Sequence, residues 1–204
     1  MTDYSHRTAL APALLSESVG RTLQEVLLVL AGTALLAISA KVKVPFYPVP
    51  MTLQTLVVVL IAATYGMRLG VATMLAYLAE GILGLPVFAN TPPMIASLTY
   101  FLGPTGGFLV AYPIAALIIG FAADRGFDRS VPKLFVAIVA GEAVIFGLGF
   151  IWLAWFAALS SGATGLGPAA AFSKGVAPFV LADALKSVLA ALLVPAGWSL
   201  LPRR

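Results

Sequence analysis

Four ionisable side chains stand inside long apolar runs of this sequence: Glu80, Glu142, Asp183 and Lys186. Asp183 and Lys186 are three positions apart, so on a helix they share one face and can bind each other or a ligand. Together they offer an acceptor for N–H groups and a cation for a carboxylate, which suits a small ligand with a polar head and an acidic tail. The alternative is an internal ion pair that only fixes helix packing.

The apolar surroundings make these charges informative. The 204 residues are 61% hydrophobic and 10% charged, which is too few charges to cover a water-soluble domain, so we expect lipid to be the solvent. An ionisable group in hydrocarbon costs at least about 2.5–3.5 kcal/mol, which makes each one a candidate for function. Glu142 is expected to snorkel or to meet Arg125 or Lys133, which favours a structural role. The role of Glu80 stays open.

Six apolar runs predict an all-α integral membrane protein with six transmembrane helices. A crossing helix needs roughly 20 mostly apolar residues. The runs cover residues 26–39, 53–65, 70–85, 108–123, 134–159 and 178–200. They predict a tail over residues 1–24 and a membrane domain over residues 25–201. The first two runs are short, so either their helices extend further or the proline-rich loop between them lies at membrane depth, sheltered by protein.

The basic residues predict the orientation, because cytoplasmic loops carry an excess of them. With the N-terminus inside the cell, the inner side collects eight: Arg7, Arg21, Arg68, Arg125, Arg129, Lys133, Arg203 and Arg204. The outer side receives Lys41, Lys43 and Lys174. We therefore expect a multi-pass protein of the plasma membrane with both termini, including the 1–24 tail, in the cytoplasm. The outer loops over residues 40–52, 88–106 and 160–177 are expected to hold the functional site.

Two outer segments have unusual composition. Residues 44–56 read VPFYPVPMTLQTL, with three prolines in six residues. Such a loop is stiff, which lowers the entropy lost when it closes over a ligand, and Phe46 and Tyr47 can supply flat apolar contact. The alternative is an interfacial turn with aromatic residues in the headgroup belt. Residues 103–107 read GPTGG before the fourth helix, whose first amides can face a polar ligand group. The Ala/Gly-rich residues 162–171 read as loop.

These segments resemble the BioY family, the biotin-specific substrate-binding S components of energy-coupling factor (ECF) transporters. The resemblance covers roughly residues 25–200. It is carried by VPFYPVPMTLQTL (44–56), GLPVFA (84–89), GPTGGFLVAY (103–112) and Asp-x-x-Lys (183–186). It implies a six-helix S-component fold with biotin bound near the outer face, under the loops after the first and third helices. It also implies that Asp183 accepts from the ureido N–H groups of biotin and that Lys186 pairs with its carboxylate.

The resemblance implies further ligand contacts from Phe46, Tyr47, Gln54, Asn90, Tyr100, Thr105 and Gly106. One segment departs from the family: between Ala89 and Gly103 the family's loop is usually richer in glycine, whereas this chain reads NTPPMIASLTYFL. No catalytic residue, metal or cofactor is implied, since biotin is the transported ligand. The implied partners are a transmembrane coupling protein and two cytoplasmic ATPase subunits, with membrane lipid around the chain and self-association left open.

Three other functions remain at this point. The ligand of the S component can be another small vitamin, since helical periodicity does not choose among small acids. An intramembrane enzyme would use Glu80, Glu142 or Asp183 as acid or base, but the sequence has no cysteine and its one histidine, His6, lies in the tail. An assembly protein would use its small-residue faces to bind other helices. No P-loop motif occurs, so the chain cannot itself couple ATP hydrolysis to uptake, and no basic–aromatic patch indicates nucleic acid.

Overall fold

The structure, a computed structural model, describes residues 10–11 and 20–199, so most of the predicted 1–24 tail lies outside it. Within that part, five helices are long and apolar enough to cross a membrane. They are α2 (Arg21–Lys41), α3 (Gln54–Ile82), α4 (Gly106–Ala123), α5 (Val131–Trp155) and α7 (Ala177–Ser199). Short elements join them: β1 (Lys43–Val44), β2 (Met51–Thr52), η1 (Leu98–Leu102), η2 (Phe127–Arg129) and α6 (Pro168–Gly175).

Helix α3 is a hairpin of two helical arms, residues 54–65 and 67–82. Gly66 joins them with φ 77° and ψ −178°, a conformation that is essentially restricted to glycine. The arms are antiparallel, because Gln54 hydrogen-bonds Tyr77 across 2.6 Å, whereas 23 residues of straight helix would span about 35 Å. Counted as two arms, α3 supplies the predicted second and third helices, and the expected six-helix membrane fold is confirmed.

The first arm of α3 is short, and the proline-rich loop completes its side of the bundle. Twelve helical residues span only about 18 Å. Before them, β1 pairs antiparallel with β2, with Lys43 opposite Thr52, and Val49 and Pro50 are buried. The end of the loop is therefore sheltered by protein, whereas residues 41–47 are exposed. The alternative that this loop lies at membrane depth stays a prediction. The other alternative also holds in part, since α2 extends beyond the predicted run at both ends.

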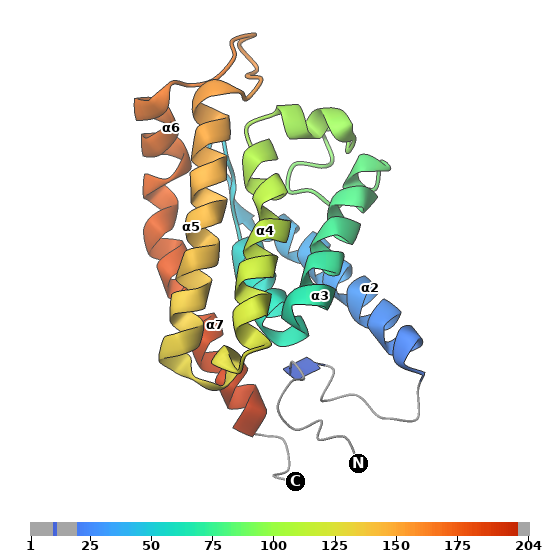
Figure 1. Cartoon of the computed structure of the whole chain (residues 1–204). Coiled ribbons are helices and arrows are strands. Elements are labelled where there is room, and N and C mark those ends of the chain that lie inside the picture. The colour runs from blue at the N-terminus through green and yellow to red at the C-terminus, as the bar shows by residue number, and fades with distance from the viewer. Residues whose placement is uncertain (1–9, 12–19, 200–204) are drawn as a thin grey trace.

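Helix α4 lies between α3 and α5, with α7 behind α5 and α2 splayed to one side (Figure 1). Small residues let these helices approach closely. A Cβ added to Gly120 of α4 would lie 2.5 Å from the backbone nitrogen of Met67, and one added to Gly149 of α5 would lie 2.3 Å from the ring of Phe108. The interior is filled by fully buried side chains such as Ile119 and Ile138.

The first described residue of α2 and the last of α7 lie at one end of the bundle, and the long loops lie at the other, which we call the loop end (Figure 1). The sequence prediction for the loop end was wrong in one place. Residues from Pro168 onward, expected as loop, form the short helix α6. Proline favours the first position of a helix and alanine has the highest helix propensity, which explains why PAAA begins one.

Candidate functional site

Asp183 and Lys186 form a buried ion pair on α7. The Nζ atom of Lys186 lies 2.6 Å from Oδ1 of Asp183, and the two side chains are 14% and 4% exposed, respectively. Three positions of separation bring both to the face of α7 that looks into the bundle, as the spacing predicts. Burial of both charges means that each needs hydrogen-bond partners beyond the other.

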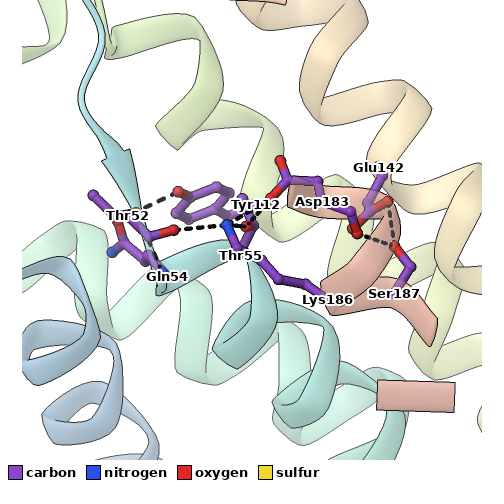
Figure 2. Close-up of polar contacts among 8 residues, drawn as sticks. All are labelled: Thr52, Gln54, Thr55, Tyr112, Glu142, Asp183, Lys186 and Ser187. Atoms are coloured by element: carbon purple, nitrogen blue, oxygen red, sulfur yellow. Dashed lines mark hydrogen bonds and ion pairs between the residues drawn. The ribbon is translucent and has the colours of Figure 1, made fainter. Parts of the chain in front are cut away.

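Strand β2 and the start of α3 supply those partners. Lys186 also donates to the carbonyl oxygen of Thr52 at 2.7 Å and to Oγ1 of Thr55 at 2.9 Å, so its three hydrogens are all used. The hydroxyl of Thr55 lies 2.8 Å from Oδ1 of Asp183, to which it donates. Figure 2 shows the second oxygen of Asp183 turned away from this network. That oxygen is an acceptor open to a ligand.

A second hydrogen-bond network lies in the wall of the site. Gln54 donates through Nε2 to the hydroxyl of Tyr77, which donates to the carbonyl oxygen of Val87 at 3.0 Å. Tyr112 donates to Oε1 of Gln54 at 3.4 Å. Because these groups are buried, each bond replaces one that water would otherwise supply. This network fixes the orientation of Gln54 and links α3, α4 and the loop after α3.

Both hydrogen-bond networks border one pocket near the loop end. Its lining is mostly apolar and aromatic with a few polar groups, which is the composition of small-molecule sites. The lining residues are Val49, Pro50, Thr52, Gln54, Thr55, Phe88, Ala89, Tyr100, Thr105, Phe108, Leu109, Tyr112, Ile145, Phe146, Phe179, Asp183 and Lys186. Burial raises the pKa of Tyr100 above its usual 10, so its hydroxyl stays protonated at neutral pH.

Two lysines hold the loop after α3 against the end of α2. Lys41 donates to the carbonyl oxygen of Phe88 at 2.6 Å and also to that of Thr91. Lys43 donates to the carbonyl oxygen of Ala89 at 2.6 Å. Since Phe88 and Ala89 line the pocket, these bonds fix one side of it.

Five of the nine residues predicted for the site line the pocket: Gln54, Tyr100, Thr105, Asp183 and Lys186. The other four lie around it: Phe46, Tyr47, Asn90 and Gly106. Phe46 packs on Phe179 with ring centroids 6.1 Å apart.

The remaining three have local contacts of their own. Tyr47 is 70% exposed and its hydroxyl lies 3.0 Å from that of Ser160. Asn90 accepts from Lys43 at 2.9 Å. A Cβ added to Gly106 would lie 1.8 Å from the carbonyl oxygen of Phe101, so this glycine permits close packing at the start of α4.

The sequence reasoning did not select Thr55, Tyr112 or Ser187. Thr55 and Tyr112 lie inside the motifs quoted above, and a polar residue within a buried apolar run was the available signal. Glu142 does not pair with Arg125 or Lys133, so that expectation was wrong: it lies 2.6 Å from the hydroxyl of Ser187, because α5 turns this position toward α7. In the part of the chain that the structure covers, no group of His, Cys, Asp or Glu has the arrangement of a metal site.

The fold is that of an S component. The chain superimposes with a TM-score of 0.73 on the crystal structure of the S component for biotin from an ECF-type ABC transporter, at 21% identity, covering 91% of this chain and 95% of that one. The BioY family model matches residues 10–203, and the chain belongs to the BioY family, a multi-pass membrane protein family.

Two curated relatives are similar to this chain in sequence. The probable biotin transporter BioY of Pyrococcus horikoshii is 37% identical over 170 residues, which are 83% of this chain and 93% of that protein. The biotin transporter BioY of Thermotoga maritima is 34% identical over 161 residues, 79% of this chain and 88% of that protein. These relatives are named as transporters, which favours a transporter over the enzyme considered above.

Proposed function

We propose that this chain binds biotin in the pocket between α3, α4 and α7 and serves biotin uptake across the membrane. The observation that carries the proposal is the buried Asp183–Lys186 pair at the edge of an otherwise apolar pocket. Biotin combines an apolar bicycle and chain with ureido N–H groups and a carboxylate. The relatives named as biotin transporters support this choice over another small vitamin.

The two charged groups have separate roles in this proposal. The open oxygen of Asp183 accepts from the ureido N–H groups, and Lys186 pairs with the carboxylate. Because the ammonium of Lys186 is already bonded to Asp183, Thr52 and Thr55, it exchanges one of these bonds for the ligand. The exchange keeps the ammonium paired, which limits the desolvation cost. Tyr100, Phe108 and Phe179 supply apolar contact to the bicycle.

Titration calorimetry of the purified protein with biotin and with biotin methyl ester tests the role of Lys186. We expect biotin to bind tightly and the ester, which lacks the negative charge, to bind at least about tenfold more weakly, or about 1.4 kcal/mol. In Lys186→Met the difference between the two ligands should disappear. If the difference persists in Lys186→Met, another group recognises the carboxylate. If biotin does not bind the folded wild type at all, the proposed function is wrong.

The proposal extends to partners and orientation. The loop end faces the outside of the cell, and a transmembrane coupling protein with two ATPase subunits energises uptake, as in an ECF-type transporter. The positive-inside distribution of Lys and Arg supports the orientation, and the lack of a P-loop motif in the sequence supports separate ATPase subunits. Uptake of labelled biotin by vesicles that contain this chain, with and without an energising complex, tests the dependence. Equal uptake in both would contradict it.

A further inference from the structure

Glu142 lies beside the pocket without lining it. The residue is 8% exposed on α5. Its Oε2 atom lies 2.6 Å from the hydroxyl of Ser187 on α7, and its Oε1 atom has no hydrogen-bond partner in the described structure. An ionised carboxylate at this place would have one donor for two oxygens. A buried carboxylate with so little compensation is unfavourable compared with its neutral form.

The hydrogen bonds around Ser187 favour the protonated form of Glu142. The Ser187 hydroxyl lies 2.6 Å from Oε2 of Glu142 and 2.7 Å from the carbonyl oxygen of Asp183 (Figure 2). A hydroxyl has a single hydrogen, so it donates to only one of these oxygens. The carbonyl of Asp183 has no hydrogen to give. A protonated Glu142 gives each short contact a hydrogen of its own, because the acid donates to Ser187 and Ser187 donates to Asp183.

The charges around Glu142 lead to the same assignment. Asp183 and Lys186 are the charged side chains that act on it. Other titratable groups on the elements that pack against α5 are hydrogen-bonded elsewhere or exposed. Tyr77 and Tyr112 bond within the pocket wall, and Asp128 of η2 bonds Trp198. Tyr65 and Glu80 are partly exposed, and Arg68, Arg129 and Lys174 are exposed. One cation therefore faces two acids, and it already pairs with Asp183 at 2.6 Å.

We propose that Glu142 is a proton-binding site coupled to the ligand pocket, where it holds a proton that binding of an anionic ligand requires. This inference rests on the proposed function. A ligand carboxylate that pairs with Lys186 brings a third negative group to a region with one cation. Ionised Glu142 would repel both the ligand and Asp183. The neutral acid removes that repulsion and keeps Asp183 positioned through Ser187.

The sign of the pH dependence follows from linkage. Below the pH at which Glu142 titrates, it is protonated in both the free and the bound protein, so affinity is independent of pH. Above it, the ligand binds only as a proton is taken up, and Kd rises about tenfold for each pH unit. Glu142→Gln is the matched variant, because an amide is always neutral and its NH2 group donates to Ser187 as the acid does.

Calorimetry in paired buffers of different ionisation enthalpy counts the protons taken up when biotin binds, from about pH 6 to about pH 9, where the carboxyl of biotin stays ionised. In the wild type we expect uptake that rises toward one proton as the pH increases, with a parallel loss of affinity. Glu142→Gln should bind with wild-type affinity at the low end of the range and take up no proton at any pH in it. The same proton count in both proteins would overturn the proposal.

Infrared spectroscopy of the ligand-free protein gives a readout that does not depend on Glu142→Gln folding or on biotin. We expect a carboxylic-acid C=O band at neutral pH that shifts in Ser187→Ala, since this variant removes the hydrogen-bond partner of the acid. A missing band, or a band that Ser187→Ala leaves unchanged, would overturn the inference. If the band is present and biotin does not bind, the proposed function fails and the proton site stands.

Discussion

At the scale of single residues, the network around Lys186 joins folding to binding. The ammonium contacts the carboxylate of Asp183 on its own helix. From a segment far away in the sequence, it also contacts the hydroxyl of Thr55 on α3 and the carbonyl oxygen of Thr52 on β2. Those bonds hold the start of α3 against α7 when the pocket has no ligand. Removal of one partner of a buried pair leaves the other charge uncompensated, whereas removal of both does not.

We therefore expect Asp183→Ala and Lys186→Met each to weaken biotin binding by at least about tenfold and to lower the stability by about 3–5 kcal/mol. The double variant should lose less stability than the sum of the single ones. Calorimetry and thermal unfolding in detergent measure the two effects. Lys174→Ala, at an exposed lysine, is the control and should change neither. Additive losses in the double variant would mean that the pair is not a unit.

Tyr77, which is buried in the wall of the pocket, provides a second test of the hydrogen-bond networks. Tyr77→Phe removes a hydroxyl that accepts from Gln54 and donates to Val87. The variant leaves a buried donor and a buried acceptor without partners, so we expect a loss of about 1–3 kcal/mol. Tyr47→Phe removes a hydroxyl from a side chain that is 70% exposed and should change the stability by less than about 0.5 kcal/mol. Equal losses of stability in Tyr77→Phe and Tyr47→Phe would contradict the stabilising role of the hydrogen bonds that join Gln54, Tyr77 and Val87.

At the scale of the elements, the reversal at Gly66 sets the position of Gln54 and Thr55 in the site. An alanine there would have to adopt the φ of 77°, at a cost of about 1–3 kcal/mol. Gly66→Ala should lower the thermal midpoint in detergent and weaken biotin binding. Gly147→Ala is the control, because a Cβ at this helical position of α5 meets nothing within 4 Å; we expect an unchanged or higher midpoint. A Gly66→Ala protein as stable as the wild type would contradict the assigned turn.

The comparison of sequence and structure is also clearest for elements. Hydropathy predicted the spanning segments, because each apolar run must satisfy its own backbone as a helix in lipid. It did not predict α6, where local propensity within a loop decides. The spacing of Asp183 and Lys186 predicted their shared face. Thr55 and Tyr112 reach the site, and Ser187 reaches Glu142, only through the packing of one helix against another. Their pairing is a property of tertiary structure that periodicity along one helix does not contain.

At the scale of the whole molecule, the proposed uptake requires the loop end to face the outside of the cell. The sequence has no cysteine, so a single introduced cysteine reports its own side of the membrane. Ser161→Cys, in the exposed loop before α6, should react with a membrane-impermeant maleimide in intact cells. Lys133→Cys, exposed near the start of α5, should react only after permeabilisation. The reverse pattern would place the pocket on the cytoplasmic side and contradict uptake from outside.

The central claim is that one ligand uses both charged groups of the buried pair. An experimental structure of the protein with biotin tests it most directly. We predict ligand density in the pocket under the proline-rich loop, with ureido nitrogens within hydrogen-bond distance of Asp183 and the carboxylate beside Lys186. Biotin bound elsewhere, or bound in the pocket with the Asp183–Lys186 pair untouched, would contradict the account.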